Sequence, residues 1–474
     1  MRKARSRRCW PGQAQNPNTT IFAYRTVARA MPFTGYWRSV MNDLSPARSL
    51  SDPDVIQDPF PYYQWALAHA PVAELPGTGI KVIMSYAMCS EAAGRVEDFS
   101  NAFTAALSGA LSADPEVSGI LAEGWPQIDT LLTADPPVHT RYRKLVNLAF
   151  SMPRVNALEA GIRQKVSGLI DAFIDKGECE FVAEYSVPLP VKVICEQLGF
   201  DLSWHSDVKR WSDAFADRLG HMISRARELE CAAEIVEFQK AVKVKIDERR
   251  ANPTDDLLSD VVNARVEGER PLDDAEILSI AQQLMVAGNE TTTHAIAGGM
   301  VHLAQNPDQA AKLRADPKLI PNAVEEILRL DTPTAGMWRV VTRDCELGGH
   351  RFKGGSMVLL RYAAANRDPA QYPDPDKFDV ERRNARTHMA FGKGTHMCVG
   401  NMLSRKEMTV SFEALLDRLD DIRLAEGTKL EVAPTCCCAG TRRCRSPSGS
   451  ADEFRPRRKS KPVQGGSGAI FVWR

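Results

Sequence analysis

The sequence has little that would carry the chain onto a membrane or a nucleic acid. It contains no run of about 18 apolar residues, so no transmembrane helix is expected. The 60 basic and 60 acidic residues cancel, so no excess of one charge favours nucleic acid. The 11 cysteines lack the spacings of a zinc site or of a secreted disulfide framework. We therefore expect a cytoplasmic protein that binds neither nucleic acid nor a membrane.

The two ends of the chain differ in composition from the part between them. Residues 1–45 are basic and lack the apolar core of a secretory signal, so we expect a disordered extension there. Residues 46–434 have the composition of one globular domain. Residues 435–474 are rich in arginine, serine and cysteine and have few apolar residues before Ala469. Such a segment cannot bury a core of its own, so we expect a disordered tail without an apolar hairpin.

The most informative segment is a glycine-rich loop, residues 391–400, which reads Phe-Gly-Lys-Gly-Thr-His-Met-Cys-Val-Gly. Gly392 and Gly394 allow unusual backbone angles and a close approach to a flat cofactor. Loop amides and the next helix N-terminus are expected to favour the anionic form of Cys398. The alternative is a buried structural thiol. The spacing resembles the cysteine-ligand loop of the haem-thiolate monooxygenases, the cytochrome P450 superfamily. The resemblance implies that Cys398 is the metal ligand of haem b, with Phe391 on its sulfur side.

A second segment, residues 287–292, reads Ala-Gly-Asn-Glu-Thr-Thr and lies in a helix expected over residues 273–303. Small residues leave room beside a metal centre, and the Thr291 hydroxyl can bond back to the carbonyl of Ala287. An ordinary helix surface with a solvated Glu290 is the alternative. The segment resembles the oxygen-activating motif of the same family. That resemblance implies that Ala287 borders the haem and that Glu290 and Thr291 handle protons in catalysis.

Four cationic side chains match positions that hold the haem propionates in this family. His139 and Arg143 lie one turn apart on a helix expected after Asp135-Pro136-Pro137. Arg339 lies in a strand-like segment, and His396 precedes Cys398 by two residues. Each could otherwise be a solvated charge. The resemblance implies that all four face the two carboxylates, because buried carboxylates need cationic partners.

Glu326 and Arg329 lie three residues apart, a spacing that in isolation indicates only a surface ion pair. Their position between the two motifs matches the Glu-x-x-Arg pair of the family. The resemblance implies a buried network completed by a later arginine, which we expect to be Arg382 rather than its neighbour Arg383.

The resemblance also implies the fold and the reaction. We expect a mainly α, triangular-prism helical domain with small β-sheets, the cytochrome P450 fold. The expected reaction inserts one oxygen atom from O₂ into a hydrophobic small molecule, to which Gln283 offers a polar contact. A peroxide-driven peroxygenase and an inactive haem-binding or sensor paralogue are the alternatives.

Electrons are expected to come from NAD(P)H through a separate ferredoxin and ferredoxin reductase. No dinucleotide fingerprint is present, and too few residues follow Cys398 for a fused flavin reductase. We expect a monomer whose surface near the cysteine loop is basic, with Lys393, Arg405 and Lys406 facing an acidic ferredoxin.

Overall fold

The computed structural model describes residues 49–50, 52–104, 114–220, 223–432, 442–445 and 470–473. The extension expected over residues 1–45 lies outside them. Helices account for most of the described chain. The α-helices are α2 (Pro53–Gln57), α3 (Phe60–His69), α4 (Tyr86–Gly94), α6 (Pro115–Leu121), α7 (Val138–Val146), α8 (Met152–Ala157), α9 (Glu159–Asp171), α10 (Pro188–Gln197), α11 (His205–Gly220), α12 (Arg225–Ala251), α13 (Leu257–Val262), α14 (Asp274–Gln305), α15 (Pro307–Ala315), α16 (Ile320–Asp331), α17 (Tyr362–Ala365) and α18 (Asn401–Arg418). Short 3₁₀ or π helices are η1 (Ile174–Lys176), η2 (Val182–Ser186), η3 (Leu202–Trp204), η4 (Pro317–Leu319), η5 (Ala385–Thr387) and η6 (Gly394–His396).

The strands form small sheets, as expected for this fold. They are β1 (Val72–Glu74), β2 (Lys81–Ile83), β3 (Phe99–Ser100), β4 (Glu178–Glu180), β5 (Met337–Val341), β6 (Cys345–Leu347), β7 (His350–Phe352), β8 (Met357–Leu360), β9 (Arg423–Leu424), β10 (Lys429–Val432), β11 (Arg442–Arg445) and β12 (Ile470–Val472). The largest sheet has the order β1-β2-β8-β5-β3. Its strand β5 runs antiparallel to β8 and places Arg339 opposite Val358. Arg339 therefore lies on an internal strand of the sheet.

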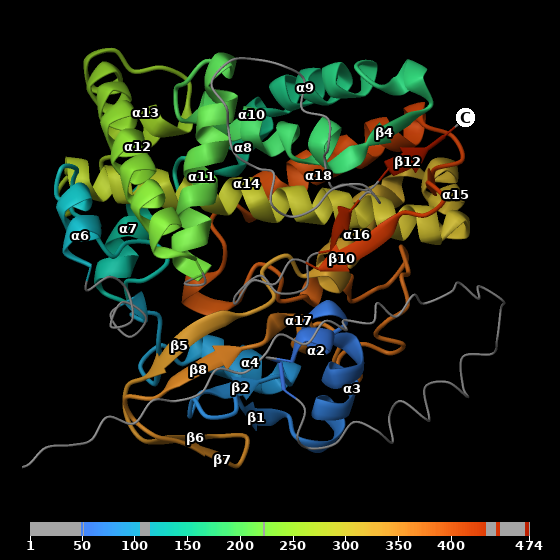
Figure 1. Ribbon diagram of the computed structural model, residues 1–474, viewed down its shortest axis with the longest axis horizontal. Helices are drawn as coiled ribbons and strands as arrows, with labels where there is room; N and C mark the ends of the chain where they lie inside the picture. Colours follow the sequence, from blue (N-terminus) through green and yellow to red (C-terminus); the bar gives the residue numbers. More distant parts are fainter. Residues whose placement is uncertain are drawn as a thin grey trace, which may run out of the picture. The chain divides into compact units, whose positions relative to one another are not determined.

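Helix α14 is the long helix expected from the sequence. Its N-terminus is a capping box: the Asp273 carboxylate accepts the N–H of Glu276, and the Glu276 carboxylate accepts the N–H of Asp273, both at 3.0 Å. It runs for 32 residues, about 48 Å, and no proline interrupts it. In Figure 1, α14 crosses the described domain with α9 and α10 above it and strands β1, β2, β5 and β8 below it.

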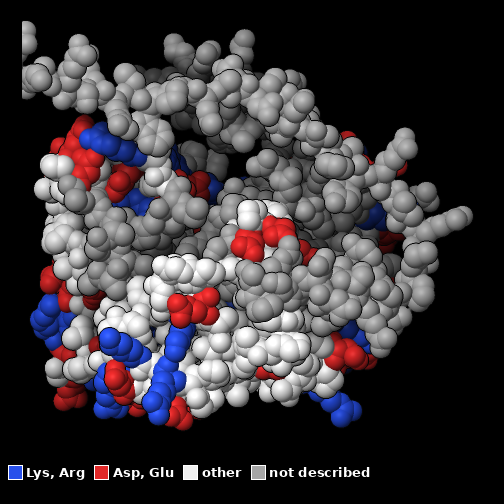
Figure 2. Space-filling model, turned by 60° about the horizontal axis from the view of Figure 1, so that its bottom comes forward, with Lys and Arg blue, Asp and Glu red and all other residues white. Residues whose placement is uncertain are grey.

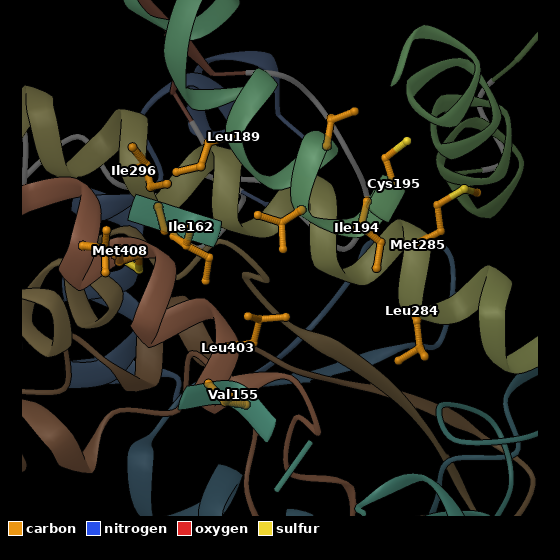
Figure 3. Close-up of a cluster of buried hydrophobic side chains, with 14 of the residues drawn as sticks. Val155, Ile162, Leu189, Ile194, Cys195, Leu284, Met285, Ile296, Leu403 and Met408 are labelled. Carbon is orange, nitrogen blue, oxygen red and sulfur yellow. The ribbon is translucent and has the colours of Figure 1, made fainter. Parts of the chain in front are cut away.

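Apolar side chains hold α14 between two other helices. Figure 3 shows Leu284 and Ile296 of α14 among side chains of α10, such as Leu189 and Ile194, and Leu403 of α18. All of these belong to one buried cluster. Burial of this kind stabilises a helix more than its local propensities do. It also places residues 287–292 beside the helix that begins just after Cys398.

The charge network expected around Glu326 is present and buried. The Glu326 carboxylate accepts both Nε and Nη2 of Arg329, at 2.7 and 2.9 Å, and Nε of Arg382 at 2.9 Å. Glu326 and Arg329 have no exposed surface, and Arg382 is also buried. The choice of Arg382 over Arg383 is confirmed. The network ties α16 to the segment that leads toward the Cys398 loop.

Part of the C-terminal tail is ordered. Strand β12 pairs with both β4 and β9, and β11 pairs with β10. Phe471 of β12 is fully buried, with its ring 5.4 Å from that of Phe181. The expectation of a disordered tail therefore does not hold for residues 442–445 and 470–473, because the last apolar residues find a partner surface far away in sequence. The rest of 435–474 lies outside the described residues.

Among the described residues, no helix is long and apolar enough to cross a bilayer. Figure 2 shows one face of the molecule, where lysine and arginine side chains are interspersed with aspartate and glutamate. Neither sign forms a continuous field over the described part of that face, as expected from the balanced composition.

Candidate active site

The loop that carries Cys398 is held by hydrogen bonds on both sides of this residue. The Cys398 N–H donates to the carbonyl of Phe391 at 2.9 Å, and the Cys398 carbonyl accepts Nδ2 of Asn401 at 2.6 Å. Gly392 and Gly394 have φ angles of 67° and 71°, which other residues adopt only with strain. The glycines of the motif are therefore required by the turn itself. Together these features place the sulfur at the N-terminus of α18.

The surroundings of Cys398 do not by themselves favour the thiolate. Burial raises the pKa of the Cys398 thiol, and this effect outweighs the Gly400 N–H and the positive charges of Arg143 and Arg405, which lower it. The Gly400 amide thus favours the anion, as expected of the loop, but the cost of burying the charge is larger. A cysteine loses its proton when it binds a metal, so coordination would supply the anionic form.

Two buried histidines lie side by side next to this loop. The rings of His139 and His396 are 4.1 Å apart, and none of their four nitrogens makes a well-formed hydrogen bond within the described residues, although the Leu131 backbone lies close enough to His396 to act on its pKa. Asp135 Oδ1 is 3.5 Å from Nε2 of His396, longer than a good hydrogen bond. Burial, with the charge of Arg143, lowers the pKa of His139 to about 4. Burial, with His139 and Arg339, also lowers the pKa of His396 to about 4.

Two arginines join the histidines. Arg339 is 2% exposed and donates to the carbonyl of Trp338 at 2.7 Å and to the Tyr362 hydroxyl at 3.4 Å. Arg143 donates to the carbonyl of Met397 at 2.9 Å. Within the described residues, no carboxylate lies within ion-pair distance of either guanidinium. We call His139, Arg143, Arg339 and His396 the cation cluster.

The cation cluster fits a cofactor that carries carboxylates. Buried polar atoms are nearly always hydrogen-bonded, and unpaired buried cations are costly. A group with two carboxylates would satisfy the orphaned nitrogens of His139 and His396 and neutralise Arg339 and Arg143. The structure thus brings together the four residues that the sequence had placed in three distant segments, and it places them beside Cys398.

The 287–292 segment has the expected local geometry. The Thr291 hydroxyl donates to the carbonyl of Ala287 at 2.7 Å, and α14 remains α-helical at this point. Ala287 is exposed although it lies midway along a largely buried helix, and Glu290 and Thr291 are half-buried. The Thr292 hydroxyl donates to the Ser404 hydroxyl at 3.2 Å and so links α14 to α18. Room beside Ala287 therefore exists where the sequence predicted it.

Two expectations about nearby residues need correction. The Gln283 Oε1 atom accepts the N–H of Leu132 at 3.1 Å, so Gln283 anchors the segment before α7 instead of offering that atom to a substrate. Arg405 forms an ion pair with Glu325, and Lys406 forms one with Glu159. Two of the three cations expected to face a ferredoxin are thus neutralised by this chain's own carboxylates.

The sequence did not reveal Tyr362 as part of the site, and it indicated Arg405 only as a surface cation. Tyr362 lies on α17, next to Arg339, and an added Cβ on Gly392 would come within 3.8 Å of its hydroxyl. No local pattern marks this tyrosine. Arg405 stacks on the Phe391 ring, with its Cζ 4.5 Å from the ring centroid. A signal existed for Arg405, since it lies in the second turn of the helix that follows Cys398.

Comparison with known proteins agrees with this architecture. The family model for Cytochrome P450 matches residues 202–428. The steroid C26-monooxygenase of Mycobacterium tuberculosis is 36% identical over 379 residues, which cover 80% of this chain and 90% of that protein. The 6-deoxyerythronolide B hydroxylase of Saccharopolyspora erythraea is 39% identical over 293 residues, which cover 62% of this chain and 71% of that protein. The structure of cytochrome P450 CYP109Q5 from Chondromyces apiculatus aligns with a TM-score of 0.73 at 31% identity and covers 89% of this chain and 97% of that chain. Together with the fold, these similarities show that the chain belongs to the cytochrome P450 family of haem-thiolate monooxygenases.

Proposed function

We propose that Cys398 would hold the iron of haem b through its sulfur in a monooxygenase that inserts one oxygen atom from O₂ into a hydrophobic small molecule, by hydroxylation or epoxidation. The family implies haem and O₂; what carries the residue assignment is the position of the Cys398 loop beside two unpartnered histidines, His139 and His396, and two arginines, Arg143 and Arg339, that have no carboxylate within ion-pair distance among the described residues. When bound, the haem supplies oxygen activation, with the thiolate donating electron density to the iron.

The cation cluster would hold the haem through its propionates. His139 and His396 offer unpartnered ring nitrogens, and Arg339 and Arg143 offer charge. A propionate beside the histidines would also raise their pKa values from about 4, since an opposite charge favours the protonated form. Phe391 would shield the sulfur side, and Ala287 would leave space on the opposite side.

Glu290 and Thr291 would handle the protons that the reaction consumes. O–O cleavage needs protons delivered to one oxygen atom, and the two residues are adjacent on the half-buried face of α14. The Thr291 hydroxyl donates its proton to the Ala287 carbonyl, so its oxygen is left to accept a hydrogen bond from a second donor. Thr291 would therefore hold a proton in place, and Glu290 would supply the proton that follows it.

The substrate would be hydrophobic and of steroid size. Phe103, Ala335 just before β5, and Leu284 on α14 are apolar and buried. Relatives act on a steroid or are named for 6-deoxyerythronolide B, and the structure of one bacterial P450 at 25% identity contains corticosterone. Steroid-like molecules are the first substrates to screen. Binding is followed through the shift of the haem Soret band, and the molecules that bind are then tested for hydroxylation.

The ligand assignment is tested by the spectrum of the reduced protein with carbon monoxide. The wild-type holoprotein is expected to show the long-wavelength band from which the family takes its name, because that band requires a thiolate ligand. Cys398→Ser is expected to lose it while remaining folded. Cys345→Ser is the matched control, since Cys345 is also partly exposed but lies on β6. A Cys398→Ser protein that keeps the band would refute the proposal.

A further inference from the structure

Glu325, the residue just before the Glu326 network, forms a separate buried charge cluster. It is 6% exposed, and its carboxylate accepts Nε of Arg405 at 2.7 Å and Nη2 of Arg405 at 3.0 Å, a two-pronged ion pair. Burial by itself would raise the pKa of Glu325, but hydrogen bonds from His388 and Arg405 outweigh it and lower the pKa to about 2. Glu325 is therefore a carboxylate at every physiological pH.

His388 supplies the third contact to Glu325, and its tautomer is defined by its surroundings. Its Nδ1 accepts the N–H of Ala390 at 3.1 Å, so the ring proton resides on Nε2, which lies 3.0 Å from Glu325 Oε2. Burial lowers the pKa of His388, which keeps the ring neutral. The cluster thus has one negative charge, on Glu325, and one positive charge, on Arg405. The exposed Arg386 stands further off, at 3.7 Å from Glu325.

From Glu325 the contacts run to Cys398 by two routes. Nη1 of Arg405 donates to Asn401 Oδ1 at 2.7 Å, and Nδ2 of Asn401 donates to the Cys398 carbonyl at 2.6 Å. The same guanidinium lies on the face of Phe391, whose carbonyl accepts the Cys398 N–H. Every polar group of Arg405 is therefore engaged, and its charge faces the cysteine loop.

We propose that Arg405, held by Glu325, is a positioning residue that sets the electrostatic potential at the Cys398 sulfur and thereby the reduction potential of the haem. The inference rests on the proposal that Cys398 binds the haem iron. The guanidinium stabilises negative charge on the sulfur and on the reduced cofactor, and Glu325 partly offsets it from the far side. Charges count more here than on an open surface because Glu325 and His388 are buried and the Arg405 side chain is only 19% exposed.

The two charges have opposite signs, so their removal has opposite effects. Arg405→Gln removes the positive charge and lowers the reduction potential. Glu325→Gln removes the negative charge and leaves the guanidinium uncompensated, which raises the potential. A network that only braced the loop would respond differently, since either variant would loosen the thiolate in the same way.

The experiment is a spectroelectrochemical titration of the haem-loaded protein. At the wild-type midpoint potential, the ratio of reduced to oxidised protein is expected to fall about tenfold in Arg405→Gln and to rise in Glu325→Gln. In the double variant the two shifts are expected to cancel in large part. Shifts of the same sign in the two single variants, or no shift in either, would overturn the inference.

Lys406→Gln is the matched control. It removes the same charge at the next position of α18, but Lys406 faces Glu159 and does not contribute to the pKa of Cys398. Its midpoint is expected to equal that of wild type, and a shift as large as that of Arg405→Gln would count against a specific role for Arg405. The carbon monoxide band separates the two proposals: its absence from wild type refutes ligation by Cys398, whereas its presence with unshifted potentials refutes only the role of Arg405.

Discussion

At the scale of single residues, the hydroxyl of Thr291 shows how one local hydrogen bond prepares a reactive position. By donating to the carbonyl of Ala287 at 2.7 Å, the hydroxyl commits its proton to the helix and leaves its oxygen able to accept a hydrogen bond. Serine and threonine make this bond inside helices because it satisfies the hydroxyl without a distant partner. The sequence suffices to anticipate it, since donor and acceptor are one turn apart.

Thr291→Ala is expected to keep the haem and to uncouple electron consumption from product formation. Without the hydroxyl, Thr291 would no longer hold a proton in place, and the two electrons would leave with O₂ and two protons as hydrogen peroxide. The yield of product per NADH is expected to fall about tenfold or more, within the range for loss of a proton-transfer group. The measurement is product and hydrogen peroxide formed per NADH consumed.

Thr292→Ala is the control for this prediction. Its hydroxyl donates to Ser404 instead of to the helix backbone, so its loss is expected to leave the yield unchanged. An unchanged yield in Thr291→Ala as well would remove Thr291 from the mechanism.

At the scale of an element, α18 carries a buried carboxyl group that the proposed reaction does not use. Glu407 is 3% exposed, and its Oε2 has no hydrogen-bond partner among the described residues. Burial raises the pKa of Glu407 to about 8, although Lys165 acts in the opposite direction. Between the ordinary value of 4.5 and about 8, the folded protein therefore binds more protons at this site than the unfolded chain. The stability that this site contributes is lost as the pH rises through that window.

Glu407→Gln is expected to remove this pH dependence. The variant gains stability relative to wild type on going from about pH 5.5 to about pH 8.5, because the amide never has to ionise in the interior. The gain amounts to a few kcal/mol at most, since one pKa unit corresponds to about 1.4 kcal/mol. Thermal unfolding of the holoprotein at the two pH values measures it. Glu413 lies on the same helix as Glu407 and forms a partly exposed ion pair with Arg163 of α9. Glu413→Gln breaks this pair and is expected to show no such trend.

At the scale of the whole molecule, the central question is where the electrons enter. The family typically depends on separate redox partners, and we propose a ferredoxin with its NAD(P)H-dependent reductase. The surface near the loop is less basic than expected, because Glu325 and Glu159 neutralise Arg405 and Lys406. Exposed apolar side chains lie in the same region, with Met397 in the loop at 45% exposure and Val138 on α7 at 50%.

Product is therefore expected from NADH with a surrogate ferredoxin and its reductase, and not from NADH alone. Added salt is expected to slow turnover only modestly, because little unpaired charge remains near the loop for salt to screen. Product formation is measured over a salt series, with peroxide alone as the comparison. Equal or faster turnover with peroxide alone would favour the peroxygenase alternative, and binding without turnover in either assay would favour an inactive paralogue.

Much of the candidate site could be predicted because its signals are local. The glycines of the Cys398 loop meet a backbone requirement within a few residues, and the capping box of α14 joins two residues that are three apart. The Glu326–Arg329 pair follows from helical spacing. In each case the interacting groups are neighbours along the chain, so their pattern can be recognised without knowledge of the fold.

The remaining contacts were decided only by the tertiary structure. The approach of His139 to His396, the capture of Arg405 by Glu325 and the pairing of β12 with β4 join segments that are far apart in sequence. Gln283 and Cys398 show the same limit. The hydrogen bond of Gln283 is decided by a distant backbone N–H, and the direction of the pKa shift of Cys398 is decided by its burial. Local backbone preferences reach only a few residues, whereas burial and charge pairing depend on which surfaces the folded chain brings together.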